Sequence, residues 1–132
     1  MNDIDTQAVM TPEGIPGFER SREWILERAT PEAVFSVMRS IDLPGVGLLV
    51  AEPWSLAPGY SPDLPDDELA RIEVSAPEDV EVYVVATLAP DRQHVYLNLA
   101  APLVVHAQRR ICRQVILDRQ GWPLRHPVTV RG

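Results

Sequence analysis

The chain has 132 residues, of which 45% are hydrophobic and 23% charged, the balance of an ordinary soluble globular protein. That length predicts one domain, spanning residues 1–132, with enough chain to bury its own core. No apolar run reaches the roughly 18–20 residues that cross a bilayer, and the acidic residues 1–5 do not resemble a secretion signal. We therefore expect a cytoplasmic protein with no membrane partner, and the single cysteine, Cys112, excludes an internal disulfide.

The net charge of −7 is unevenly distributed along the chain. Residues 1–90 carry 17 Asp and Glu against five Arg, whereas residues 91–132 carry two acids against seven Arg. Most of the chain would repel phosphates, so no direct nucleic-acid partner is predicted. The pattern favours a basic protein partner, because complementary potentials speed encounter and set orientation. The alternative is that the acids only keep the surface solvated.

Thirteen prolines and seven glycines divide the chain into short pieces, which argues against a helical bundle because proline breaks helix interiors. Runs rich in Val, Ile, Leu and aromatic residues predict β-strands, and turn residues separate them. The predicted strands span residues 4–10, 22–28, 34–39, 47–54, 80–88, 95–100, 103–107, 111–117 and 128–130. Between them, residues 12–17 predict a turn, and residues 60–64 predict a short extended piece between prolines.

One short helix is predicted over residues 66–73. Pro65 and the acids that follow it suit a helix N-terminus, and Leu69 with Ile72 forms an i, i+3 apolar pair. Many short strands with turns roughly every 8 to 12 residues are typical of an all-β protein. We therefore predict an all-β fold with a minor helix, forming a small closed or nearly closed β-barrel-like single domain.

A Pro and an Asn interrupt the apolar segment near the end of the chain. Pro102 separates two apolar runs and must stop or bend the strand, because it cannot donate to a sheet ladder. Asn98 lies inside the first run, where a buried amide needs partners for both its donors and its acceptor. Two roles stay open for Asn98: bonding to neighbouring backbone at the bend, or contacting a partner.

The sequence contains no recognisable reactive cluster, so no catalytic, metal-binding or cofactor-binding residues are predicted. The three histidines, His94, His106 and His126, have no ligand neighbours at strand or helix spacing. Cys112 lies among arginines that lower a thiol pKa, but a lone Cys on a strand is typical of a core residue. We therefore expect a binding module and no enzyme, with no cofactor. The alternative is a small-ligand-binding β-barrel or an enzyme that uses His106 or Cys112.

Two motifs carry a family resemblance. The segment Gly14-Ile15-Pro16-Gly17-Phe18 resembles a signature near the start of the FliW family of bacterial flagellar assembly factors. The segment Asn98-Leu99-Ala100-Ala101-Pro102 resembles that family's later Asn-Leu-x-Ala-Pro motif. Further segments match in consistent order, at residues 37–40, 77–82, 114–117 and 125–127. The stretch before Gly14 is short for the family, so we expect its edge strand to be missing or reduced.

The resemblance implies a small β-barrel-like fold and a non-enzymatic role in flagellum biogenesis. FliW-type proteins bind the translational repressor CsrA and relieve its repression of flagellin synthesis. They also bind flagellin itself, as a chaperone does, so that translation regulation is coupled to assembly. CsrA holds RNA and must be basic, which is consistent with the acidic first two-thirds of this chain.

The candidate residues fall into two groups. The first group comprises candidates for partner contact, namely Asn98 and the acids Asp66, Asp67, Glu68, Glu78, Asp79 and Glu81. The second group comprises motif residues expected to serve turn geometry, chain direction and packing, namely Gly14, Ile15, Pro16, Gly17, Phe18, Ala101 and Pro102.

Overall fold

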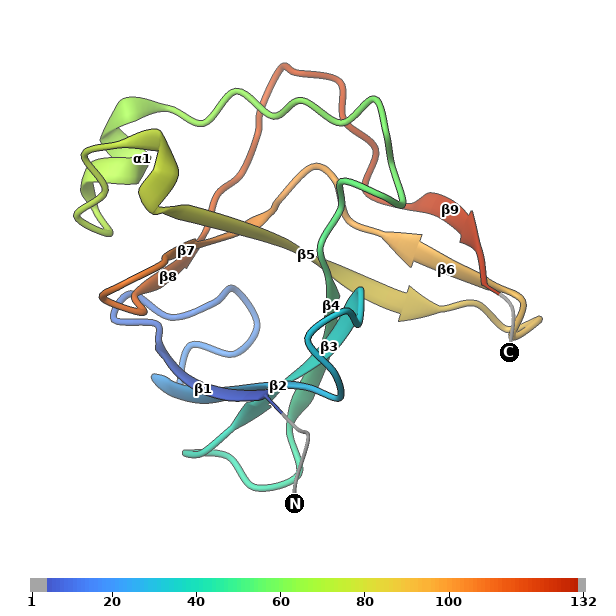
Figure 1. Cartoon of the computed structure of the whole chain (residues 1–132), viewed down its shortest axis with the longest axis horizontal. Helices are drawn as coiled ribbons and strands as arrows, with labels where there is room; N and C mark the ends of the chain where they lie inside the picture. Colours follow the sequence, from blue (N-terminus) through green and yellow to red (C-terminus); the bar gives the residue numbers. More distant parts are fainter. Residues whose placement is uncertain (1–4, 131–132) are drawn as a thin grey trace.

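The computed structural model describes residues 5–130, and nine antiparallel strands dominate them (Figure 1). The strands are β1 Asp5–Met10, β2 Glu23–Arg28, β3 Phe35–Ser40, β4 Gly47–Ala51, β5 Val80–Leu88, β6 His94–Leu97, β7 Leu103–His106, β8 Cys112–Gln114 and β9 His126–Thr129. One α-helical turn, α1 Asp66–Ala70, and one 3-10 turn, η1 Pro77–Asp79, precede β5. The predicted all-β class with a minor helix is confirmed.

The strands form a curled sheet that resembles a half-barrel (Figure 1). β1 to β5 follow one another as neighbours, and the nine-residue strand β5 is the centre of the sheet. Its first half pairs with β7 and its second half with β6, while β4 pairs with it only at Val84 and Val85. An isolated bridge between Met10 and Ile111 brings the end of β1 to the start of β8, so the curl nearly closes.

Most predicted strands exist, but several ends differ. The expected strand 95–100 ends at Leu97, so Asn98 lies just beyond β6 and not inside a strand. The expected strand 111–117 shrinks to β8, because the amides of Val115 and Leu117 donate to carbonyls of the loop 98–102. The helix expected over 66–73 is only α1 followed by a turn, and residues 60–64, expected as a short extended piece, belong to no helix or strand.

The prediction of a reduced N-terminal edge strand is wrong for the described residues. β1 pairs with β2 over six consecutive positions, from Asp5 opposite Arg28 to Met10 opposite Glu23. Val9 of this strand is fully buried in the core. Residue 4, the first of the expected strand, lies outside the described residues.

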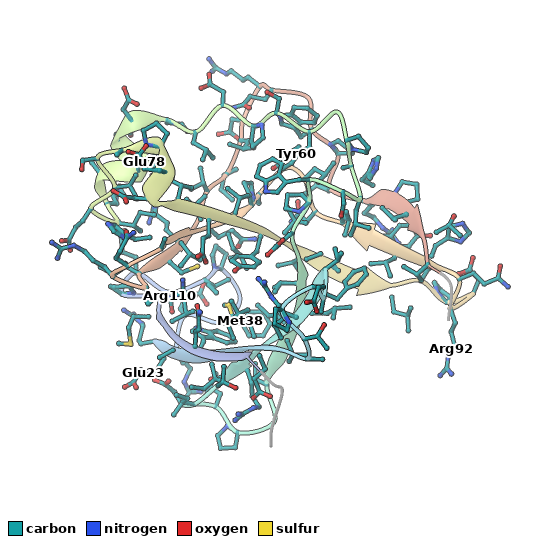
Figure 2. The ribbon with its side chains drawn as sticks, in the orientation of Figure 1. Glu23, Met38, Tyr60, Glu78, Arg92 and Arg110 are labelled. Atoms are coloured by element: carbon teal, nitrogen blue, oxygen red, sulfur yellow. The ribbon has the colours of Figure 1, made fainter. Side chains whose placement is uncertain are left out.

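Three apolar clusters form the interior. The largest lies within the curl, where Trp24 and Val50 are fully buried and Met38 is central (Figure 2). A second cluster packs β5, β6 and β9 against Tyr60 and its neighbours, and a third packs Ile72, which follows α1, against β7 and the end of β8. Apolar strand faces meet on the inside of the curl, so the sheet supplies its own second layer.

The 14–18 motif packs against the largest cluster, as its predicted structural role requires. Gly14 and Gly17 have φ of +77° and +91°, a backbone region that glycine enters at no steric cost. Ile15 is buried, and the ring of Phe18 meets Trp24 edge-on at 6.2 Å between centroids. The motif therefore closes a tight turn onto the core tryptophan.

A candidate protein-interaction groove

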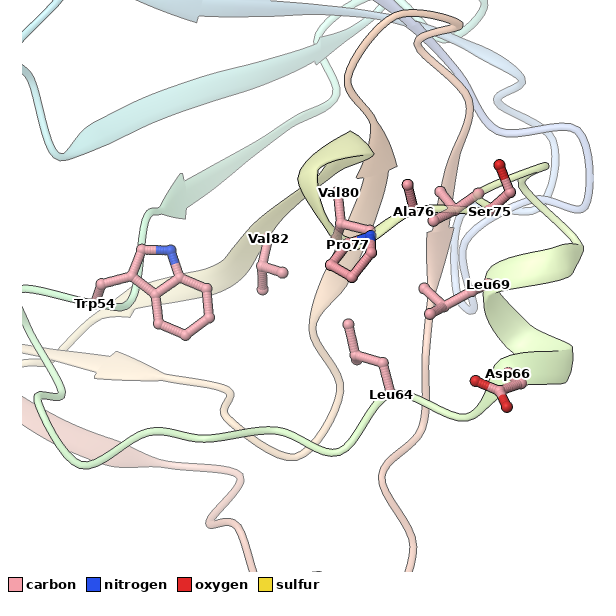
Figure 3. Close-up of a pocket in the computed structure, with 10 residues that line it drawn as sticks. Trp54, Leu64, Asp66, Leu69, Ser75, Ala76, Pro77, Val80 and Val82 are labelled. Carbon is pink, nitrogen blue, oxygen red and sulfur yellow. The ribbon is translucent and has the colours of Figure 1, made fainter.

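A groove of about 540 Å³ lies between α1 and the start of β5, and the segment that precedes α1 also lines it (Figure 3). Its lining is mostly apolar. The lining residues are Trp54, Leu64, Asp66, Leu69, Val74, Ser75, Ala76, Pro77, Val80 and Val82. Figure 3 shows Trp54 at one end and Asp66 at the other, with Leu64 and Val80 between them.

Local sequence explains why these apolar side chains stay at the surface. Pro65 starts α1, and Glu73 has a φ of 64°, which reverses the chain immediately after the helical turn. The Val74 amide then donates to the Leu69 carbonyl at 3.0 Å, which closes the turn. Only Ile72 is anchored inside, so Leu69 and Val74 remain partly exposed along the groove.

Four of the predicted partner-contact acids lie on the two short helical turns beside this groove. Asp66 and Asp67 belong to α1, and Glu78 and Asp79 to η1. Within residues 5–130, none of these four carboxylates forms an ion pair. Uncompensated acids beside an apolar groove make this surface attractive to a basic, partly apolar partner.

The other two predicted acids already have partners inside the molecule. Glu68 accepts a hydrogen bond from Arg113 Nε at 3.1 Å, and its side chain is 18% exposed. Glu81 accepts from Arg110 Nη1 at 2.9 Å and from the Tyr83 hydroxyl at 3.1 Å. These two carboxylates tie β8 and the β7–β8 hairpin to α1 and β5, and present less free charge to a partner.

Glu13, beside the 14–18 motif, joins the Glu68 network. Its Oε1 atom accepts from Arg71 Nη1 at 2.9 Å and from Arg113 Nη1 at 2.8 Å. Residues far apart in the chain thus meet around one guanidinium, which no local sequence pattern indicates. The network joins α1 to β8 beside one wall of the groove.

Asn98 bonds to local backbone. The backbone N–H of Asn98 donates to the Val85 carbonyl at 2.9 Å, and the side-chain Oδ1 accepts from the backbone N–H of Ala100 at 3.1 Å. Pro102, which is buried, offers its carbonyl to Val115. The Asn98 side chain therefore shapes the bend that separates β6 from β7. It does not line the groove.

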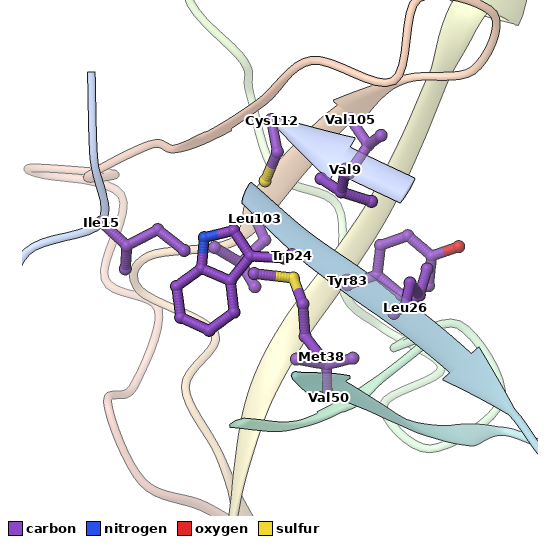
Figure 4. Packing of buried hydrophobic residues seen from close by; sticks show 10 residues of the cluster. All are labelled: Val9, Ile15, Trp24, Leu26, Met38, Val50, Tyr83, Leu103, Val105 and Cys112. Atoms are coloured by element: carbon purple, nitrogen blue, oxygen red, sulfur yellow. The ribbon is translucent and has the colours of Figure 1, made fainter. Parts of the chain in front are cut away.

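His106 and Cys112 do not form a common site. Cys112 points into the core beside Val9 and Trp24, and burial raises the pKa of its thiol to about 12, which disfavours the thiolate (Figure 4). His106 Nδ1 accepts the amides of Gln108 and Arg109 at 3.2 Å, so it shapes the tip of the β7–β8 hairpin. Cys112 therefore serves core packing, and His106 serves the geometry of the hairpin.

Two structural facts about residues 5–130 bear on function. No three His, Cys, Asp or Glu side chains in that range lie close enough to hold a metal ion. No helix in the same range is long and apolar enough to span a membrane.

Together the fold and the groove define a small half-barrel β protein that carries an apolar groove with acids beside it. The model of the FliW protein family matches residues 2–128, and the chain therefore belongs to the FliW family. This confirms the resemblance carried by the 14–18 and 98–102 motifs.

Individual relatives agree with this assignment. The flagellar assembly factor FliW of Clostridium kluyveri is 31% identical over 120 residues, covering 91% of this chain and 83% of that protein. The flagellar assembly factor FliW of Geobacillus kaustophilus is 32% identical over 114 residues, covering 86% and 78%. A crystal structure of the flagellar assembly factor FliW superimposes with a TM-score of 0.84 at 31% identity, covering 94% of this chain and 86% of that one. These relatives are named as assembly factors and not as enzymes.

Proposed function

We propose that this chain is a cytoplasmic, non-enzymatic regulator that binds CsrA and flagellin, and so couples flagellin synthesis to flagellum assembly. In this scheme the whole chain acts as one domain. It captures the basic repressor and relieves repression, and free flagellin competes for it. Membership of the FliW family supports the flagellar role.

The observation that carries the proposal is a set of four acids beside the groove that form no ion pair within residues 5–130. Asp66, Asp67, Glu78 and Asp79 lie on two short helical turns, next to partly exposed apolar side chains. An RNA-binding repressor is necessarily rich in positive charge, so it is drawn to such a surface. Apolar lining then adds the affinity that charge at a rim does not supply.

The direct test measures binding of the purified chain to CsrA and to flagellin from the same host, by surface plasmon resonance at several salt concentrations. We expect dissociation constants of about 1 μM or tighter. Reversing two groove acids together, Asp66→Arg with Asp67→Arg, should slow association with CsrA about tenfold at low salt. The difference should shrink above roughly 0.3 M salt, because screening shortens the reach of the charges.

A matched control is Glu23→Arg with Asp118→Arg, which changes the net charge equally at two exposed residues that do not line the groove. We expect this control to slow association about threefold or less. Equal slowing by both double variants would show that net charge matters but the groove does not. Absence of binding to both partners would refute the proposed function.

A further inference from the structure

The edge of β5 that faces β4 is left open along its first half. β4 pairs with β5 only at Val50 with Val85 and Ala51 with Val84. Continuing that antiparallel register would place Pro53 opposite Val82. Pro53 has no amide proton to donate, and its carbonyl instead accepts the amides of Leu56 at 3.2 Å and Ala57 at 2.8 Å. β4 therefore leaves the sheet at this point.

The backbone groups on that open edge can be identified from the β5–β7 pairing. In an antiparallel ladder, successive residues point their N–H and C=O groups to opposite edges. The Asp79 carbonyl accepts the Ala107 amide at 2.8 Å, which places the odd-numbered residues of this stretch toward β7. Val82 therefore turns both its N–H and its C=O toward the edge that β4 has left, and no strand within residues 5–130 pairs there.

The two faces beside this edge differ in chemistry. On one face, the side chains of Val80 and Val82 line the apolar groove together with Trp54, which is 49% exposed. Along the edge itself lies a more polar cavity of about 300 Å³, lined in part by Arg28 and Tyr83. An added strand would thus meet apolar side chains on one face and polar side chains on the other, which matches the alternation within a strand.

We propose that an extended segment of a basic partner protein adds to this open edge of β5 as a further strand. Its alternate apolar side chains fill the groove, and Val82 supplies the backbone hydrogen bonds. The free acids Asp66 and Asp79, near the start of β5, select a segment that carries arginine or lysine at its end. The inference rests on the proposed function for the basic nature of the partner, and adds the mode of binding.

The test uses the full chain, labelled with ¹⁵N, and the synthetic peptide acetyl-Arg-Val-Thr-Val-Thr-Val-Arg-amide. With the peptide at about 1 mM, amide exchange at Val82 should slow about tenfold, because its proton gains a backbone acceptor. Val84 provides the internal reference: it lies on the same edge but already pairs with Ala51, so its exchange should not change. A peptide with both arginines replaced by glutamates should bind about tenfold more weakly.

A pair of variants locates the binding side chains without threatening the fold. Trp54→Ala removes a half-exposed wall of the groove and should weaken peptide binding about tenfold. Leu124→Ala removes a side chain that is 66% exposed and does not line the groove, and should leave the affinity within about twofold.

Unchanged exchange at Val82, or equal binding of the acidic peptide, would overturn the inference. The whole-partner measurements test the proposed function separately. A chain that binds CsrA without protection of Val82 keeps its function and loses this binding mode.

Discussion

The Thr11 hydroxyl ties the backbone at Ser21 to the core residue Trp24, and its removal offers a sharp test of that role. The Thr11 side chain is fully buried, donates to the Ser21 carbonyl at 3.0 Å, and accepts from Trp24 Nε1 at 3.1 Å. Thr11→Val keeps the shape of the side chain and removes both bonds. Two buried groups, an indole N–H and a carbonyl, are then left without partners.

Each orphaned group costs about 1–3 kcal/mol, and the added methyl group returns about 0.8 kcal/mol. The expected loss in free energy of unfolding is therefore about 1–5 kcal/mol. For a chain of this length, a loss of about 3 kcal/mol lowers Tm by roughly 10 °C. Partner affinity should stay within about twofold, because Thr11 is buried and does not line the groove.

Urea denaturation followed by far-UV circular dichroism measures this loss, with Thr129→Val as the control. Thr129 is exposed in β9, so its substitution should change stability by about 0.5 kcal/mol or less. A loss below about 1 kcal/mol for Thr11→Val would refute the reasoning. It would mean that the indole and the carbonyl find other partners when the hydroxyl is absent.

Two further predictions concern residues singled out in the sequence. Asn98→Ala removes the acceptor for the Ala100 amide and should cost about 1 kcal/mol of stability in the same assay, with the affinity for both partners kept within about twofold. Loss of binding by a normally folded Asn98→Ala protein would contradict the local role. Burial raises the pKa of the Cys112 thiol from 9.0 to about 12, so the folded state keeps the thiol protonated. The stability that Cys112 contributes is therefore complete below pH 9 and is lost as the pH rises toward 12. Unfolding experiments on Cys112→Ala should show a shallower alkaline decline, and a thiol reagent at pH 8 should react with the native chain only as fast as it opens.

A strand could be predicted from the sequence where its residue composition and the prolines beside it are enough to define its ends. The strand 80–88 has the predicted ends, because β-branched residues fill it and Pro77 and Pro90 bound it. The 14–18 turn was likewise predictable, since two glycines with positive φ follow one another closely. Local chemistry is sufficient for such features.

The groove and the open edge could not be predicted, because both depend on register. The sequence shows Pro53 close to the end of the predicted strand 47–54, but only the pairing of Ala51 with Val84 shows that β4 ends at Ala51 and leaves Val82 without a β4 partner. Likewise, the acids of residues 66–68 look equivalent along the chain. The helical turn brings Glu68 to Arg113, 45 residues away, and leaves Asp66 at the groove. Long-range pairing therefore decides which predicted contacts remain available.

The charge asymmetry along the chain affects pairing inside the fold as well as the charge of the surface. Arginines of the last third pair with acids of the first two-thirds, as Arg110 does with Glu81 and Arg113 with Glu68. Partly exposed pairs of this kind stabilise a protein by only about 0–1 kcal/mol each, so they do little to hold the half-barrel together. Their main effect is on where free charge remains. They neutralise acids that face β8 and its hairpin, whereas the acids of the two helical turns beside the groove form no ion pair within residues 5–130 and stay available to a basic partner strand that joins the open edge.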